Sequence, residues 1–148
     1  MQGQNSGSPM YIAVIDDEID LVYLFKDALS QIDGVHVFTF TNPEVALEHF
    51  KINHRNYRVV VADYRMPSMT GTQMFERMRS INPGVARILV SAFEVHDKVF
   101  SYCQCVDKFL QKPVSMVNLV DEVEICLKMQ FQKVQKVDWC YYTNTVRS

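Results

Sequence analysis

The sequence predicts an α/β domain built on a five-stranded parallel sheet with helices on both faces. Short apolar segments rich in β-branched residues alternate along the chain with segments whose apolar residues recur at helical spacing. The clearest strand segments are apolar on both faces, as strands buried inside a parallel sheet are. Five strand–helix units follow one another in about 125 residues, and crossovers of this length require parallel strands covered by helices on both sides.

Five segments are expected to form strands, at residues 11–16, 35–40, 58–63, 86–91 and 107–111. The first reads YIAVID and the third RVVVAD, and both end in an acidic residue. Five further segments are expected to form helices, at residues 18–31, 41–53, 72–82, 94–104 and 115–136.

Local signals mark the ends of two of these helices. Thr41 or Asn42 is expected to cap the second helix, with Pro43 in its first turn, where the missing N–H costs nothing. Pro83 and Gly84 end the third helix.

Apolar spacing predicts which faces of two helices are buried. In the first helix the expected buried stripe consists of Leu21, Leu24, Phe25, Ala28 and Leu29. In the last helix it consists of residues 116, 117, 120, 123, 127 and 131.

The overall composition bounds the class of protein. A chain of 148 residues with 48% hydrophobic and 22% charged residues is expected to be one soluble globular domain. The net charge of −2 supplies no basic field, so direct nucleic-acid binding is not expected. No apolar run approaches the roughly 20 residues that cross a bilayer, and no secretory signal is present, so we expect a cytoplasmic protein without membrane contact.

Three segments are expected along the chain. Residues 1–9 are rich in Gly, Ser and Gln and are set aside as a disordered N-terminal segment or a remnant of cloning, with Met10 as the native start. Residues 10–133 form the domain. Residues 134–148 form a tail that contains the single tryptophan, Trp139, and either folds back onto the domain or contacts a partner.

The cysteines and histidines do not indicate a metal site. Cys103 and Cys105 are separated by one residue and no C-x-x-C pair exists, so all four cysteines are expected to be reduced thiols. His49 and His54 are the only near pair of histidines and have no cysteine beside them, so packing or surface roles are expected.

Charged and hydroxyl side chains stand where the predicted strands end. Asp16 and Asp17 end the first strand, Asp63 the third and Ser91 the fourth, and Lys112 follows the fifth. The carboxyl ends of parallel strands meet at one edge of the sheet, where ligands collect. Carboxylates brought together there repel one another unless a cation lies among them, and all-oxygen ligands suit Mg²⁺.

The same set suits phosphoryl chemistry. A lysine and a hydroxyl bind a tetrahedral oxyanion, so Asp63 is expected to be a carboxylate nucleophile that accepts a phosphoryl group. Taken one by one, Asp16 or Asp17 could be a helix cap and Asp63 a turn former. Those separate roles do not explain acids and a lysine at four strand ends.

Four motifs together resemble the receiver domain of two-component response regulators. They are Asp16-Asp17, VVVADYRMPSMTG at 59–71, ILVSAF at 88–93 and FLQKPV at 109–114, in this order over about residues 10–130. The resemblance implies a flavodoxin-like, chemotaxis-regulator-like fold with strand order 2-1-3-4-5.

The resemblance also implies roles for individual residues. Asp63 would be the phosphoacceptor, and Asp17, Asp63 and the backbone carbonyl of Arg65 would bind Mg²⁺, with Asp16 helping through water. Lys112 would pair with the phosphoryl oxygens, and its bond to Pro113 would be cis.

Further roles follow from the same comparison with the family pattern. Ser91 would hydrogen-bond the new phosphoryl group, and Phe109 would be the aromatic switch, although a plain core role for Phe109 is nearly as well supported. Gly71 stands where the chain turns into the third helix. Arg65 and Phe93 occupy positions that modulate the lifetime of the phosphoryl bond, and their bulk predicts slow self-dephosphorylation, unless Arg65 only faces solvent.

A phosphoacceptor of this kind implies a sensor histidine kinase or a histidine phosphotransfer protein as donor. The face built from the fourth helix, the fifth strand and the fifth helix is where receivers dimerise or dock partners, so a homodimer through it is one expected contact. Two other functions fit the pattern less well. A Mg²⁺-dependent phosphatase would need an acid two residues after its nucleophile, where Arg65 stands, and a receiver-like interaction module without phosphorylation would be expected to lack part of the set.

Overall fold

The computed structural model describes residues 7–92 and 104–130. Within them, five strands form one parallel sheet in the order β2-β1-β3-β4-β5, which confirms the predicted fold class. The strands are β1 (Met10–Ile15), β2 (Val35–Phe40), β3 (Tyr57–Asp63), β4 (Ala86–Ser91) and β5 (Lys108–Gln111).

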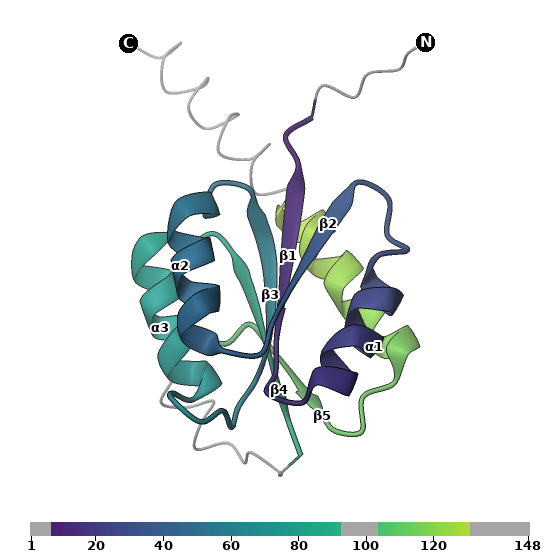
Figure 1. Ribbon diagram of the computed structural model, residues 1–148. Coiled ribbons are helices and arrows are strands. Elements are labelled where there is room, and N and C mark those ends of the chain that lie inside the picture. Colours follow the sequence, from purple (N-terminus) through teal and green to yellow (C-terminus); the bar gives the residue numbers. More distant parts are fainter. Residues whose placement is uncertain (1–6, 93–103, 131–148) are drawn as a thin grey trace, which may run out of the picture.

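Helices cover both faces of this sheet. They are α1 (Ile19–Leu29), α2 (Pro43–Asn53), α3 (Gly71–Ile81) and a helix over residues 116–130 that leads toward the C-terminus. Figure 1 shows α2 and α3 on one face and α1 with the helix 116–130 on the other. None of the helices in the described ranges combines the length and apolar character of a membrane span.

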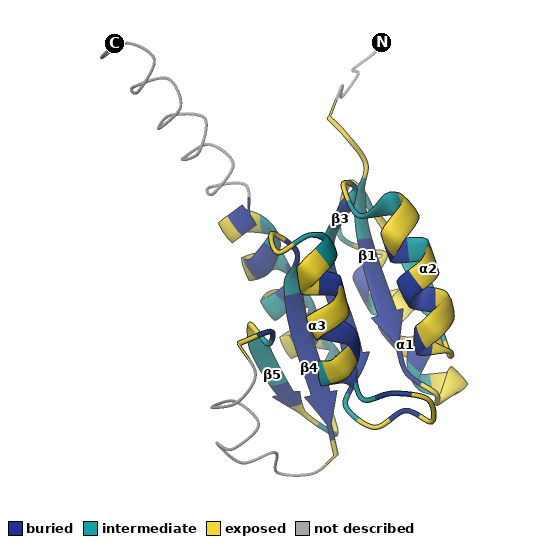
Figure 2. Cartoon of the chain, turned by 90° about the vertical axis from the view of Figure 1, so that its left-hand side faces the viewer, coloured by how far each residue is buried: buried dark blue, intermediate teal, exposed yellow. Residues whose placement is uncertain are grey.

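Alternation along the central strands divides the core into two halves. In β1, Ala13 and Ile15 face α2 and α3, whereas Ile12 and Val14 face α1 and the helix 116–130. All four are at most 2% exposed, and the same dark interior runs along β3 and β4 in Figure 2. A strand buried on both faces leaves its ends as the only places where side chains reach solvent.

The predicted helix signals are present where expected. The Asn42 side chain accepts a hydrogen bond from the Glu44 N–H at 2.9 Å, and Pro43 is the first residue of α2. Thr70 caps α3 through a reciprocal capping box with Gln73.

Two predicted stripes are partly wrong. In α1, Leu24 is 49% exposed and Val22 is buried with Phe25 and Leu29. In the last helix Val117 is 72% exposed, and the buried stripe is Leu119, Val123, Cys126 and Gln130. In each helix the predicted apolar face is rotated about the helix axis relative to the face that is buried. Neighbouring residues differ by about 100° around a helix, so an error of one residue is enough to cause such a rotation.

The expectation of reduced thiols is wrong at Cys105, which is disulfide-bonded, whereas Cys126 is a buried thiol. The predicted helix at 94–104, apart from its last residue, and the tail 134–148 lie outside the described residues.

Candidate phosphoacceptor site

The carboxyl edge of the sheet brings the predicted site residues together. Asp63 and Ser91 are the last residues of β3 and β4, and Asp16 and Lys112 directly follow β1 and β5. Backbone hydrogen bonds continue the ladder at this edge, from Tyr64 N to Val90 O at 2.8 Å and from Lys112 N to Ser91 O at 2.7 Å. The edge is therefore held rigidly by main-chain atoms.

The Lys112 ammonium lies between the carboxylates of two different strands. Its Nζ is 3.0 Å from Asp16 Oδ2 and 3.3 Å from Asp63 Oδ1. A third carboxylate, Glu18 Oε1, is 3.6 Å away. Sequence reasoning gave Glu18 no role, because a residue next to the Asp pair can point to either side of the loop.

Three aspartates form one carboxylate cluster. Asp16, Asp17 and Asp63 each offer an oxygen within 4.8 Å of the others. Asp16 is 2% and Asp63 8% exposed, and Asp17 is exposed at the mouth of the cluster. Three carboxylates face one ammonium, so the cluster carries excess negative charge that a divalent cation would balance.

The pKa values at this site respond to burial and to the neighbouring charges. Burial raises the pKa of Asp16, against the hydrogen bonds from the Glu18 N–H and from Lys112. Burial also raises the pKa of Asp63, with Lys112 opposing the rise and Asp17 adding to it. For Lys112 burial acts to lower the pKa, but its hydrogen bond to Asp16 and the charges of Asp16 and Asp63 outweigh burial and raise it.

The loop after Asp63 closes onto the strand it leaves. The Gly71 N–H donates to the Tyr64 carbonyl at 2.9 Å. A Cβ on Gly71 would lie 2.5 Å from the Asp63 carbonyl oxygen and 2.8 Å from Leu89, closer than real Cβ atoms approach other atoms. Glycine is therefore required at this position, which explains why it stands at the start of α3.

The remaining predicted residues have different surroundings. Ser91 is buried at 1% exposure beside the cluster edge, and Phe109 is half-buried on β5 against the core half that contains α3. Arg65 is exposed, and Phe93 lies outside the described residues. The Lys112–Pro113 peptide bond is cis, as predicted.

Comparison with known proteins identifies the family in which this fold occurs. The family model described as the response regulator receiver domain matches residues 12–124. The chain therefore belongs to the receiver domain family of two-component signal transduction, whose members are signalling modules.

The curated relatives are longer than this chain. The transcriptional regulatory protein GlrR of Escherichia coli is 28% identical over 83% of this chain and 27% of its own length. The probable transcriptional regulatory protein TcrX of Mycobacterium tuberculosis is 28% identical over 82% of this chain and 51% of its own length. The chain thus spans about half or less of the relatives it matches.

Solved structures share the fold. A CheY-like response regulator receiver domain from Methanospirillum hungatei has a TM-score of 0.74 at 24% identity, covering 85% of this chain and 99% of that chain. A receiver domain from Clostridium thermocellum has a TM-score of 0.73 at 25% identity, covering 86% and 98%.

Proposed function

We propose that the chain accepts a phosphoryl group on Asp63 and uses it to change a surface that a partner reads. The observation that carries the proposal is the position of Lys112 Nζ, within 3.3 Å of Asp63 and 3.0 Å of Asp16, beside the three-carboxylate cluster. A carboxylate nucleophile next to a fixed cation and a cation-binding cluster is the arrangement that phosphoryl transfer needs.

The donor set fits Mg²⁺. Asp17 and Asp63 would bind the ion directly with the Arg65 backbone carbonyl, and Asp16 would help through water. These are hard oxygen ligands of the kind that Mg²⁺ prefers, and few enough for it to keep several waters. When bound, the ion neutralises charge on the phosphoryl oxygens and on Asp63.

The chain's own residues would then carry out the transfer. An Asp63 carboxylate oxygen attacks the phosphorus of a phosphohistidine on a sensor histidine kinase or a histidine phosphotransfer protein. The new O–P bond forms as the P–N bond breaks, and the electron pair of that bond stays on the donor imidazole. Lys112, released from part of its contact with Asp63, pairs with a phosphoryl oxygen.

Buried Ser91 and half-buried Phe109 would respond to the change. The Ser91 hydroxyl, at the end of β4, would hydrogen-bond the phosphoryl group, and Phe109 on the neighbouring strand would turn inward to fill the space. The strand β5 and the helix 116–130 would carry the altered surface to a partner or a second copy in the cytoplasm, and the relatives named as transcriptional regulators suggest a role in regulation.

The direct test is incubation of the chain with Mg²⁺ and acetyl phosphate, followed by intact mass. We expect one added phosphoryl group that hydroxylamine removes, because an acyl phosphate is attacked at carbon and a serine phosphate is not. Asp63→Asn should take up none. Asp33→Asn, an exposed aspartate in the turn after α1, is the matched control and should behave as the unsubstituted chain does.

Other outcomes separate the alternatives. Continuing turnover of a phosphate ester, with no stable adduct, would favour a phosphatase. A folded chain that takes up no phosphoryl group from acetyl phosphate or phosphoramidate would favour an interaction module that is not phosphorylated.

The lifetime of the adduct tests Arg65 and Phe93. A long cation and a ring beside the site would obstruct the water that attacks the aspartyl phosphate, so decay should be slow. Arg65→Asn with Phe93→Ala should make the adduct decay several-fold faster, measured as loss of the phosphorylated mass over time. An unchanged decay rate would show that neither side chain obstructs the attacking water.

A further inference from the structure

Glu18 is a third carboxylate beside the Lys112 ammonium, and it takes no part in the phosphoryl transfer proposed above. Its Oε1 is 3.6 Å from Lys112 Nζ. The side chain of Glu18 is 69% exposed, whereas those of Asp16 and Asp63 are 3% and 10% exposed. Glu18 therefore meets the ammonium from the solvent side, which is the side from which a phosphoryl donor must also approach.

Helix capping does not explain why a glutamate stands at this position. Glu18 is the N-cap residue of α1, but its side chain makes no capping hydrogen bond. Ser, Thr, Asp and Asn cap well, because the oxygen of a short side chain reaches the free N–H groups of the first turn. The longer side chain of Glu18 instead extends to Lys112, which directly follows β5.

Glu18 also lies outside the carboxylate cluster that would hold a divalent cation, which consists of Asp16, Asp17 and Asp63. A cation bound there would neutralise the cluster, so the Glu18 carboxylate would remain a partner of Lys112. An ammonium has three N–H donors. The three carboxylates around it lie at 3.0 Å (Asp16), 3.3 Å (Asp63) and 3.6 Å (Glu18). A phosphoryl oxygen that pairs with Lys112 must therefore replace one of them.

We propose that Glu18 competes with phosphate oxyanions for the Lys112 ammonium and so weakens their binding at the site. The inference rests on the function proposed above, because that function brings such an oxyanion to Lys112. Glu18 is the partner that gives way, since its contact is the longest of the three and its side chain is the most exposed. It acts through Lys112 and not on the reacting atoms, so it is a positioning residue.

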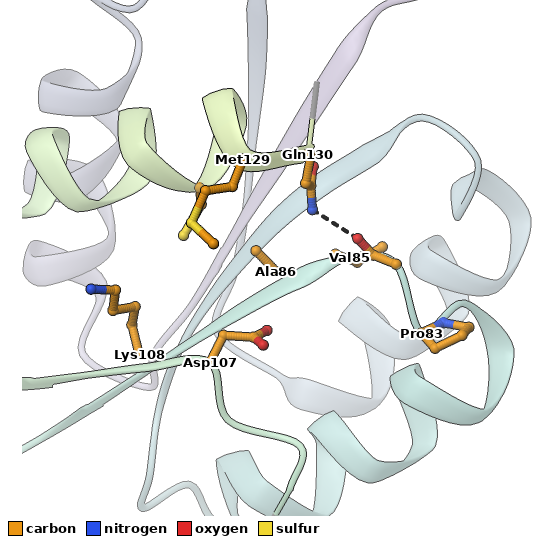
Figure 3. A pocket seen from close by; sticks show the side chains of 9 residues that line it. Pro83, Val85, Ala86, Asp107, Lys108, Met129 and Gln130 are labelled. Atoms are coloured by element: carbon orange, nitrogen blue, oxygen red, sulfur yellow. Dashed lines mark hydrogen bonds between the residues drawn. The ribbon is translucent and has the colours of Figure 1, made fainter. Parts of the chain in front are cut away.

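A second lysine–glutamate pair, at the other end of β5, serves as a comparison. Lys108 lines a pocket of about 140 Å³ together with Asp107 and Met129 (Figure 3). Its Nζ is 3.2 Å from Glu122 Oε2. Among the described residues, the one cluster of three carboxylates that could hold a cation lies at the carboxyl end of the sheet. The pair at Lys108 therefore has no phosphoryl site beside it, whereas the pair at Lys112 does.

Titration of the full chain with inorganic phosphate tests the proposal and requires no phosphoryl transfer. The dissociation constant is measured at one saturating Mg²⁺ concentration, from the amide NMR shifts of the loop after β1. Glu18→Gln keeps the shape of the side chain and removes its charge, so phosphate should bind about two- to fivefold more tightly, the effect of one exposed ion pair. Asp20→Asn removes the same charge from an exposed side chain in the first turn of α1 that does not pair with Lys112, and it should leave the dissociation constant unchanged.

A double-mutant cycle separates competition for Lys112 from plain repulsion between Glu18 and an anion. Acetyl phosphate is a dianion near neutral pH, so a carboxylate close to its path could also slow its approach. Glu18→Gln should raise the rate of phosphoryl uptake from acetyl phosphate by about two- to fivefold in the otherwise unsubstituted chain. In the Lys112→Met chain it should have no effect, because the group for which Glu18 competes is absent.

The proposal fails if Glu18→Gln and the unsubstituted chain bind phosphate equally, or if Asp20→Asn gives the same gain. It also fails if Glu18→Gln keeps its effect on the uptake rate in the absence of Lys112. A chain that binds phosphate as expected but takes up no phosphoryl group would contradict the proposed function and would still support the competition for Lys112.

Discussion

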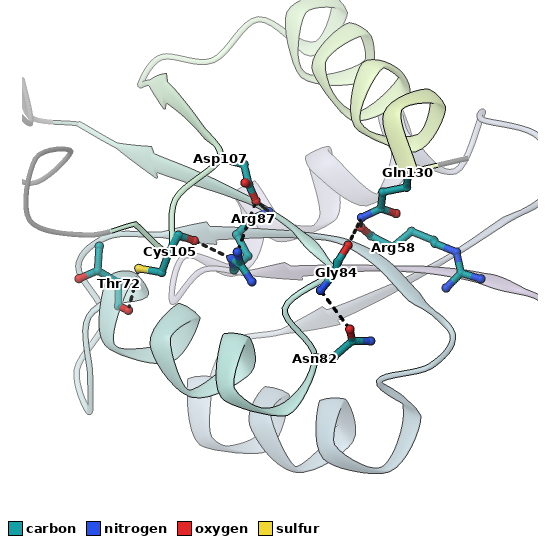
Figure 4. A network of polar contacts seen from close by, with 8 residues as sticks. All are labelled: Arg58, Thr72, Asn82, Gly84, Arg87, Cys105, Asp107 and Gln130. Carbon is teal, nitrogen blue, oxygen red and sulfur yellow. Dashed lines mark hydrogen bonds and ion pairs between the residues drawn. The ribbon is translucent and has the colours of Figure 1, made fainter. Parts of the chain in front are cut away.

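Lys112 and Arg87 are two largely buried cations at opposite ends of neighbouring strands, and their partners differ in kind. Lys112 follows β5 and touches the carboxylates of Asp16, Asp63 and Glu18. Arg87, near the start of β4 and 4% exposed, donates from Nε to the Cys105 carbonyl at 2.6 Å, with one carboxylate, that of Asp107, at 3.8 Å (Figure 4).

This difference distinguishes the proposed reactive site from a structural one. Around Lys112 the negative groups outnumber the cation, so the cluster has charge left over that can bind another cation. Burial lowers the pKa of Arg87, which Asp107 opposes, yet a guanidinium stays charged in proteins, and its partners leave no excess negative charge. Buried charge alone therefore does not single out the candidate site, whereas its excess of negative charge does.

The largest expected effect comes from removing the cation at the reactive end. Lys112→Met should lower the rate of phosphoryl uptake from acetyl phosphate by about 100- to 1,000-fold, because one preorganised group on the transferred oxygens is lost. The measurement is the rate at which the phosphorylated mass appears. Lys108→Met, which removes a half-exposed ammonium paired with Glu122 at 3.2 Å, is the matched control on the same strand.

If Lys112→Met folds and still takes up phosphoryl at the original rate, Lys112 only balances the charge of Asp16 and Asp63. The contrast between Lys112 and Arg87 would then carry no information about function.

Much of the reactive end could be predicted from the sequence. Each strand is a short apolar segment, and Asp16, Asp63, Ser91 and Lys112 follow from where those segments end. The topology of a parallel sheet then brings strand ends together without any knowledge of side-chain contacts. That is why the fold and the carboxylate cluster were predicted correctly.

The contacts at the opposite end of the sheet, where Arg87 lies, could not be predicted in this way. Arg87 lies inside an apolar strand, and its hydrogen-bond acceptor is a main-chain carbonyl. Every residue has such a carbonyl, so the residue types in the sequence do not indicate which one accepts. The bond from Gln130 to Gly84 joins segments 46 residues apart and depends on the exact rotation of the last helix, which the apolar pattern misplaced. The disulfide at Cys105 was not predicted either, because the spacing of the four cysteines is not that of a disulfide framework.

A smaller effect, on stability rather than function, is expected at Arg87. Arg87→Met keeps similar volume but leaves the Cys105 carbonyl without its donor, so the free energy of unfolding should fall by about 1–3 kcal/mol, measured in urea. Phosphoryl uptake should be unchanged. Arg79→Met, an exposed arginine on α3, should shift stability by no more than about 0.5 kcal/mol. Loss of uptake in a folded Arg87→Met chain would contradict the structural role.

The smallest effect is expected at a part-buried pair that carries no charge, His49 and Tyr57. The His49 Nδ1 lies 2.7 Å from the Tyr57 hydroxyl, and His49 is packed beside Phe38 with ring centroids 4.6 Å apart. Burial raises the pKa of Tyr57, so its hydroxyl keeps its proton, and burial lowers the pKa of His49. Protons then bind the unfolded chain more readily than the folded one.

This contribution to stability should be complete above the ordinary histidine pKa of about 6.5 and should be lost as the pH falls through the lower value of the folded chain. His49→Gln should flatten this decline, measured by urea unfolding between about pH 7.5 and pH 5. The exposed His36 supplies the control, since His36→Gln should keep the decline of the unsubstituted chain. If His49→Gln keeps it too, the decline does not arise from this pair, and the neutral pair adds nothing to the contrast between the two ends of the sheet.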